Sequence, residues 1–284
     1  MPELPEVETV ARQLEPRLVG RTVRRLQIFD PRLRNGRTPR VAGRSILAVA
    51  RLGKRVLIEL SPAAGARAGL WLAVHLRMTG RLLWTDEPSD RKHLRARFQL
   101  DRGELLFRDS RRFGTFDWYR SAADAAPAGL DPLSPDLTPR QLGDLLRGST
   151  QSLKAWLLRQ DRLVGLGNIY ASEILHAARL SPFREARTLT RAEVERLHRC
   201  TRRILERAIR NCGTTFSDFR DARGMSGSYQ QLLAVYDREG RPCRRCRVAV
   251  ERVVQQQRST FFCPGCQGRG RTRRRVSSSG RQTR

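Results

Sequence analysis

Four cysteines near the end of the chain constrain its fold more than any other feature. They form two C-x-x-C pairs, Cys243 with Cys246 and Cys263 with Cys266. Two such pairs are typical of a tetrahedral structural zinc site, which has no open coordination position. A disulfide framework is the alternative, and the lack of an export signal argues against it. We therefore expect one structural zinc ion. The other two cysteines fall in or beside a helical pattern and are expected to be structural thiols: Cys200 and Cys212.

Net charge is the strongest global signal. The chain has 56 lysines and arginines against 28 acidic residues, a net charge of +28. Arginine predominates, and its guanidinium fork matches phosphate oxygens and guanine edges. Nucleic acid is therefore the first partner to expect. The alternative is that the composition reflects a GC-rich genome and the charges are merely solvated. No apolar run approaches the roughly 20 residues of a membrane span, so we expect a soluble protein with no membrane partner.

The first part of the chain has the pattern of a β-structure. Residues 20–120 alternate apolar and polar positions, and the turn-forming triplets LGK and DRG separate strand pairs. We expect an antiparallel β-sandwich, preceded by a short helix from Pro5 that Pro16 and Gly20 bring to an end. The fold class is α+β with two domains, the first over residues 1–130.

Helical patterns replace the strands after a linker-like stretch at 121–137. Thr138 with Gln141, and Thr190 with Glu193, have capping-box spacing, so a helix is expected to begin after each threonine. SLKAWLLRQ and NIYASEILHAARL are further helical segments. We assign a helical domain, a zinc finger and a disordered basic tail to three successive ranges: 131–236, 237–267 and 268–284.

The amino end, MPELPE, suggests chemistry. Methionine is normally removed before a small residue such as Pro2, which then carries a free secondary amine. Part of such an amine is neutral at physiological pH and can attack a sugar C1′ to form an iminium ion. Glu3 is placed to act as a general acid or base. The alternative for this stretch taken alone is a plain helix start, where proline and glutamate are favoured.

Three motifs resemble the bacterial formamidopyrimidine-DNA glycosylase family, which also has an endonuclease VIII-like branch. They are PELPEVETV, GLGNIYASEIL and QRSTFFCPGCQ, and the resemblance runs over residues 2–267. It implies a bifunctional DNA glycosylase and AP lyase that excises 8-oxoguanine and formamidopyrimidines from damaged double-stranded DNA. It also implies a sandwich with a leading catalytic helix, a helix-two-turn-helix domain and a β-hairpin zinc finger.

The resemblance implies a set of catalytic roles. Pro2 matches the nucleophile, and Glu3 matches the acid that protonates the sugar ring oxygen. Glu6 is similar to a glutamate that supports this site. Lys54, in RLGKRV, matches a lysine that contacts phosphate and transfers a proton in β-elimination; otherwise it is an ordinary turn lysine. Arg258, at the tip of the two expected zinc-finger strands, matches the proton donor for δ-elimination.

Three residues resemble the family's wedge, which enters the duplex when a base is extruded. Met78 would fill the gap, Phe113 would stack between base pairs, and Arg111 would hydrogen-bond the orphaned base. Extrusion is required because the reacting C1′–N9 bond is shielded in a stacked duplex. Apolar insertion offsets part of the unstacking cost. Taken alone, Met78 and Phe113 would be assigned to the core.

Three more residues resemble DNA-backbone contacts. Asn168 begins a helix after a glycine-rich turn, which aims backbone N–H groups outward toward phosphate. Lys154 is expected near the same DNA strand. His93 matches a backbone-contacting histidine, although its neighbours RKHLR differ from the family's KHDH, and a plain surface histidine is the alternative.

Three departures from the family pattern concern DNA affinity and opposite-base preference. The stretch RGSTQS lacks a lysine cluster, Arg77 stands where HLGM has glycine, and Ser110 stands where DPRRFG has proline. None of them touches the implied chemistry.

Two other functions fit parts of the sequence. An endonuclease VIII-like enzyme would excise oxidised pyrimidines, but that branch usually begins PEGP, and residues 216–229 suit a loop that closes over flipped 8-oxoguanine. A catalytically silent zinc DNA-binding protein would need neither Pro2 nor Glu3. We expect a monomer in the bacterial cytoplasm, associated with the nucleoid, whose DNA binding depends steeply on salt.

Overall fold

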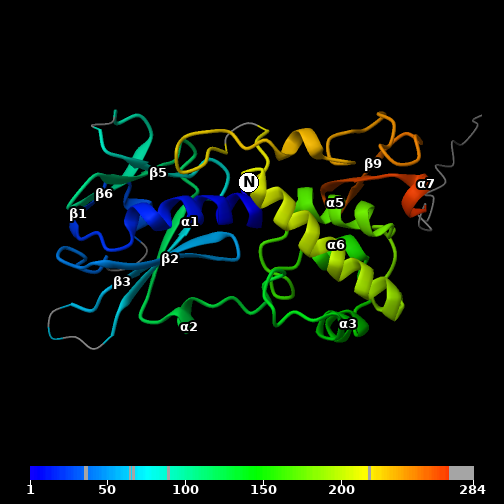
Figure 1. The fold of residues 1–284 in the computed structure, drawn as a ribbon, viewed down its shortest axis with the longest axis horizontal. Coiled ribbons are helices and arrows are strands. Elements are labelled where there is room, and N and C mark those ends of the chain that lie inside the picture. The colour runs from blue at the N-terminus through cyan, green and yellow to red at the C-terminus, as the bar shows by residue number, and fades with distance from the viewer. Residues whose placement is uncertain (35–37, 64, 66–67, 88–89, 217–218, 269–284) are drawn as a thin grey trace, which may run out of the picture.

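The structure is a computed structural model, and it describes every residue except 35–37, 64, 66–67, 88–89, 217–218 and 269–284. The tail expected at 268–284 therefore lies, apart from Gly268, outside the described residues. A strand-rich half and a helix-rich half lie next to each other, with the amino end between them (Figure 1). Within the described part of the chain, no helix is both long and apolar enough to cross a membrane.

Two antiparallel four-stranded sheets build the strand-rich half. Their strand orders are β1-β6-β7-β5 and β2-β3-β4-β8, and side chains of both sheets share one apolar core. The expected antiparallel sandwich is thus confirmed. The strands are β1 Val23–Ile28, β2 Ile46–Leu52, β3 Arg55–Leu60, β4 Leu70–His75, β5 Arg81–Thr85, β6 Leu94–Leu100, β7 Glu104–Arg108 and β8 Thr115–Tyr119, with a 3-10 turn η1 at Pro31–Leu33.

The leading helix, α1 (Leu4–Leu18), joins the two halves. Leu4 packs in the core of the helical half, whereas Val7 and Val10 pack in the sandwich core. Pro16 lies inside the last turn rather than at the helix end, and the chain leaves the helix at Gly20, whose φ is +82°. Because α1 crosses the junction, its first residues are held by both domains.

The helical half contains the expected helices with shifted ends. The linker includes a one-turn helix capped by Ser121. The helix that begins at Asn168 ends earlier than expected because the backbone of Arg179 is in the left-handed conformation. The helices are α2 Ala122–Ala125, α3 Pro139–Arg147, α4 Leu153–Leu157, α5 Asn168–Ala178 and α6 Arg191–Arg210, with 3-10 turns η2 Ala186–Thr188 and η3 Tyr229–Leu232.

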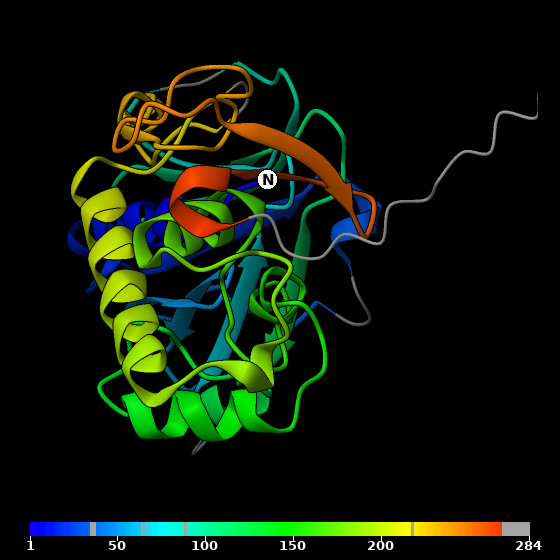
Figure 2. The ribbon, with the colours of Figure 1, turned by 90° about the vertical axis from the view of Figure 1, so that its right-hand side faces the viewer.

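A two-stranded hairpin follows, made of β9 (Glu251–Gln255) and β10 (Arg258–Phe262). It leads into the short helix α7 (Pro264–Gln267), and both lie against α5 (Figure 2). The hairpin therefore sits on the same face of the helical domain as the start of α5, close to the amino end of the chain.

Candidate active site

The amino end opens into a cavity of about 300 Å³ between the two domains, called here the terminal cavity. Met1 is half exposed in it, and the following residue, Pro2, is buried. Polar and charged residues from both halves of the molecule share the lining: Lys54, His75, Arg77, Gln160 and Arg258. Met1, the residue before Pro2, thus shares this cavity with the cationic side chains of Lys54, Arg77 and Arg258.

The carboxylate of Glu3, the residue after Pro2, is buried. One oxygen accepts hydrogen bonds from the backbone N–H groups of Gly167 (2.8 Å) and Tyr170 (3.3 Å), and the other from Ile169 (3.0 Å). Glu3 thus caps the amino end of α5, where the helix dipole favours negative charge. Burial nevertheless raises the pKa of Glu3, against the opposing charge of Lys54 and these N–H donors. A raised pKa favours an acid that can donate a proton near neutral pH.

Glu6 lies one turn further along α1 and is also buried. Its carboxylate accepts hydrogen bonds from the Glu3 N–H (2.8 Å), the Tyr170 hydroxyl (2.6 Å) and the Thr214 N–H (2.7 Å). Burial, followed by the nearby Glu3 charge, raises the pKa of Glu6 to about 7. Glu6 therefore ties α1 to Tyr170 of α5 and to Thr214, and it holds Glu3 in place rather than lining the cavity.

The Glu6→Gln variant is expected to flatten the pH dependence of stability. The folded protein keeps the Glu6 proton up to about pH 7, whereas the unfolded chain releases it near pH 4.5. The folded state therefore binds more protons in this window, and the free energy of unfolding falls with rising pH, by up to about 1.4 kcal/mol per pH unit. Urea unfolding at several pH values should show this contribution in the native chain and not in the variant. Equal slopes would contradict it.

Lys54 lies in the turn between β2 and β3 and reaches into the terminal cavity. Burial lowers the pKa of Lys54, Glu3 opposes this, and Arg258 adds to it. A lysine with a lowered pKa can accept and return a proton as well as bind a phosphate. The turn expected for Lys54 therefore places its side chain in the cavity that Met1 also lines.

The β9–β10 hairpin is locked to the helical domain just behind Arg258. Lys154 and the Asn168 side chain both donate to the Ser259 carbonyl, at 2.7 and 2.9 Å, and Lys154 also donates to the Thr260 hydroxyl at 2.8 Å. Lys154 is buried, and burial, with the nearby Arg258 charge, lowers its pKa to about 8. In this structure the Lys154 ammonium lies inside the protein and binds the hairpin, and its contact with DNA stays a prediction.

Arg258 lines both the terminal cavity and a second cavity of about 780 Å³. Asn168 and Tyr236 line this second cavity together with Arg241 and Arg252. Amide, phenol and guanidinium groups around one concave surface suit phosphate oxygens. The expected phosphate-binding residues Asn168 and Arg258 are therefore brought together.

The three expected wedge residues form an exposed cluster on the sandwich. Met78 is 41% and Phe113 48% exposed. Arg111 lies between them: its guanidinium donates to the Met78 sulfur at 3.2 Å and stacks 4.7 Å from the Phe113 ring centroid. Their exposure excludes the assignment of Met78 and Phe113 to the core.

Asp109, which the sequence analysis did not single out, shapes this wedge. Its buried carboxylate accepts hydrogen bonds from the Thr79 hydroxyl and from the N–H groups of Arg111 (3.2 Å) and Gly114 (2.8 Å). Its own N–H donates to the carbonyl of His93 at 2.9 Å, which places His93, exposed at the start of β6, beside the wedge loop. An acidic residue directly before the SRRFG stretch is the sequence signal that could have revealed it.

His75 is a second residue that sequence analysis missed. It ends β4, lines the terminal cavity, and accepts a hydrogen bond on Nδ1 from the Arg77 N–H at 3.0 Å. Burial, then Arg77 and Lys54, lower its pKa to about 4. The ring is therefore neutral at physiological pH with its proton on Nε2, a hydrogen-bond donor.

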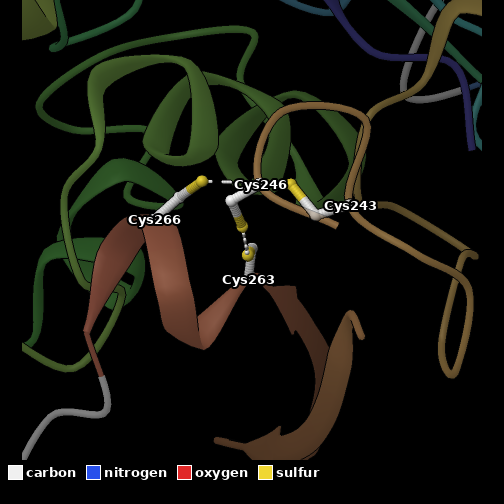
Figure 3. Close-up of side chains that lie close together, drawn as sticks. All are labelled: Cys243, Cys246, Cys263 and Cys266. Carbon is white, nitrogen blue, oxygen red and sulfur yellow. Dashed lines mark hydrogen bonds between the residues drawn. The ribbon is translucent and has the colours of Figure 1, made fainter. Parts of the chain in front are cut away.

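The four cysteines of the two C-x-x-C pairs converge where the chain before β9 meets the start of α7 (Figure 3). All four sulfur atoms lie within 4.8 Å of one another, with Cys246 and Cys263 at 3.3 Å and Cys243 and Cys266 at 3.9 Å. A tetrahedral ion with Zn–S bonds of about 2.3 Å requires sulfur separations close to these values. The residues fit one structural zinc ion, as the spacing predicts.

Three family models match the chain in order. They describe the formamidopyrimidine-DNA glycosylase N-terminal domain over residues 1–116, the H2TH domain of that enzyme over 128–220, and a zinc finger found in FPG and IleRS over 240–268. The chain belongs to the formamidopyrimidine-DNA glycosylase family. The family resemblance, the α+β fold and the zinc finger expected from the sequence are thereby confirmed.

Curated relatives and solved structures support the same family assignment. Formamidopyrimidine-DNA glycosylase of Symbiobacterium thermophilum is 45% identical over 94% of this chain and 89% of its own length. The crystal structure of the MutM (Fpg) protein from Thermus thermophilus matches with a TM-score of 0.82 at 43% identity, over 95% of this chain and all of that one. The Lactococcus lactis Fpg bound to abasic-site DNA matches with a TM-score of 0.82 at 32% identity, over 94% and 100%.

Proposed function

We propose that this chain is a bifunctional DNA glycosylase and AP lyase of base excision repair, acting on 8-oxoguanine and formamidopyrimidines. One observation carries the proposal. The residue that becomes the amino terminus, Pro2, follows a methionine lining the terminal cavity and precedes the buried acid Glu3, with Lys54 and Arg258 in the same cavity. A pure DNA-binding protein has no use for an amine and an acid so placed.

The first step forms a covalent bond to the damaged nucleotide. The neutral nitrogen of Pro2 bonds to C1′, the C1′–N9 bond breaks, and the base leaves with that electron pair and takes up the proton that the Pro2 nitrogen releases. Glu3 donates a proton to the ring oxygen as the C1′–O4′ bond opens, and the nitrogen lone pair completes the C=N bond of an iminium ion. The raised pKa of Glu3 supports its role as donor.

The iminium ion then permits strand cleavage. Loss of the C2′ proton drives β-elimination and breaks the C3′–O3′ bond, with Lys54 as the group that transfers the proton. A second elimination removes the C4′ proton and breaks the C5′–O5′ bond, with Arg258 as the donor of a proton to the leaving phosphate, and water finally releases Pro2. A one-nucleotide gap with phosphate ends remains.

The other candidate residues hold the DNA. Met78, Arg111 and Phe113 form the wedge, while His93 and Asn168 are exposed or partly exposed groups for the backbone. Lys154 acts by fixing the hairpin that carries Arg258, and Glu6 by fixing Glu3. The proposal divides the chain into four ranges: 1–130, 131–236, 237–267 and 268–284. It also states that the enzyme is a monomer in the bacterial cytoplasm, associated with the nucleoid.

Phe113→Ala is expected to weaken binding to a lesion-containing duplex by about tenfold or more, because stacking on a base contributes roughly 1–3 kcal/mol. Binding to single-stranded DNA should change far less, since no base pair must be opened. Leu47→Ala, which also truncates an exposed apolar residue of the sandwich, is the matched control. Fluorescence titration of both variants with both DNAs checks the prediction, and equal losses for the two variants would contradict it.

Borohydride trapping tests the proposed function directly. The mature chain is incubated with an 8-oxoguanine:cytosine duplex and, in parallel, with a thymine glycol duplex. A covalent adduct on the first duplex, absent when Met1 is retained, supports the proposal. An adduct on thymine glycol alone assigns the chain to oxidised pyrimidines; a Lactococcus lactis relative has been solved with oxidized pyrimidine DNA. Tight binding without an adduct or cleavage identifies a silent DNA-binding protein.

A further inference from the structure

Gln160 is an exposed residue whose side-chain amide closes the turn between α4 and α5. Its Nε2 donates to the carbonyls of Leu158 (3.0 Å) and Leu166 (2.9 Å), and its Oε1 accepts from the Gly165 N–H (3.0 Å). One carboxamide thus joins the end of α4 to the last residues before α5. An exposed glutamine with three backbone hydrogen bonds is fully committed to the shape of this turn.

The turn that Gln160 closes is the turn that holds the amino end of the chain. The Gly165 carbonyl accepts a hydrogen bond from the Leu4 N–H at 2.9 Å, and the Gly167 N–H donates to the Glu3 carboxylate at 2.8 Å. Gln160 binds Gly165 itself and the carbonyl of Leu166 between the two. Both of these hydrogen bonds therefore start within one residue of a group bonded to Gln160.

The fit around these residues leaves little freedom. A Cβ at Gly165, whose φ is +90°, would lie 2.8 Å from the Leu4 side chain, and one at Gly167 would lie 2.4 Å from the Glu3 carboxyl. A shift of the turn is therefore transmitted directly to Glu3 and to the residue before it. Gln160 also lines the terminal cavity with Met1, Lys54 and Arg258.

We propose that Gln160 is a positioning residue for the reaction: by fixing the 160–167 turn, it sets the Pro2 amine and the Glu3 carboxyl relative to Lys54. It does not touch the reacting atoms in this scheme. The inference rests on the proposed function, because it assigns to Gln160 the placement of the proposed nucleophile. Misplacement by about 1 Å can lower a rate about 100-fold, so the effect should appear in chemistry rather than in binding.

The exposure of Gln160 makes the test clean. Because Gln160 is exposed, Gln160→Ala and Gln160→Leu are expected to fold, with a stability loss from the three missing hydrogen bonds of about 0.5–1.5 kcal/mol each. Gln141→Ala is the matched control, because Gln141 is also exposed and its Oε1 accepts the Thr138 N–H at 2.9 Å in the capping box of α3. It removes a turn-closing amide at the end of the helical domain far from the amino end (Figure 2).

Three quantities are measured for each variant: the single-turnover excision rate on an 8-oxoguanine duplex, the affinity for a duplex with a non-cleavable abasic analogue, and the free energy of unfolding. Both Gln160 variants are expected to lose about 10- to 100-fold in rate, with affinity changed by less than about threefold. Gln141→Ala is expected to keep the native rate, even where its stability loss equals that of the Gln160 variants.

The outcomes separate the two proposals. If the native chain traps DNA and the Gln160 variants excise as fast as Gln141→Ala, this inference is overturned while the proposed function stands. A rate loss that tracks the stability loss in all three variants also overturns it, because the role is then merely structural. If the native chain forms no adduct, the proposed function itself fails.

Discussion

Glu3→Gln is expected to lower the rate of base excision by about 10³-fold, within the range for loss of a general acid. Burial raises the pKa of Glu3, so the native side chain holds a transferable proton at pH values where a solvated glutamate does not. Glutamine has the same shape but no such proton. Its NH₂ group also faces one of the three backbone N–H groups that donate to Glu3. That N–H group then has no acceptor, which lowers stability by roughly 1–3 kcal/mol.

Glu8→Gln is the control for this substitution. Glu8 lies on the same helix, and its carboxylate pairs with Arg12 and Arg51 rather than with the start of α5. Single-turnover excision, measured from pH 5 to 9 beside the melting temperature, distinguishes chemistry from folding. Native-like excision by Glu3→Gln at any pH would remove Glu3 from the mechanism, whereas a loss in both variants would point to damage to α1.

The features predicted from sequence are those that short segments determine. The zinc ligands follow from two C-x-x-C pairs, and the start of α1 follows from a proline-glutamate capping pattern. The wedge residues, by contrast, are expected only from the family resemblance, and their role stays a prediction. The structure brings the turns that carry them together because β4 pairs with β8 and β5 pairs with β7. The zinc ligands and the start of α1 could be predicted because residues close in sequence determine them.

The features that could not be predicted depend on contacts between distant residues. The Glu3 carboxylate meets the start of α5, 164 positions away, and Lys154 meets Thr260, 106 positions away. Lys154 looks like a surface cation in sequence, but the hairpin covers it. Single-sequence patterns report which face of an element is apolar, and they carry no information about which polar group lies opposite.

Glu173 illustrates the same limit. It sits in the middle of NIYASEIL, where the sequence suggests only a helical position. In the structure its buried carboxylate accepts hydrogen bonds from the N–H groups of Ala234, Val235 and Tyr236, at 2.8 to 2.9 Å. Helix α5 thus holds the amino end through Glu3 at its first turn and the approach to the zinc finger through Glu173. One helix aligns the proposed nucleophile with the hairpin that carries Arg258.

That alignment predicts a large effect of zinc removal. Cys246→Ser is expected to abolish stoichiometric zinc binding and to weaken binding to a lesion duplex by about 100-fold or more. The apparent binding free energy of a structural zinc ion, about 10–16 kcal/mol in small finger peptides, is folding free energy. Without the ion, the small core of the finger, which includes Val250 and Phe261, is too small to hold β9 and β10 together. Arg258 then loses its fixed place beside Lys54.

The control is Cys212→Ser, because Cys212 lies outside the four-cysteine cluster. Metal analysis should give one zinc ion per chain for the native protein and for Cys212→Ser, and none for Cys246→Ser. The sandwich has its own core, so Cys246→Ser should retain cooperative unfolding while DNA binding and borohydride trapping fall together. Trapping that persists at native levels without zinc would show that the Pro2 amine works without the hairpin. Arg258 would then not be needed to position the sugar.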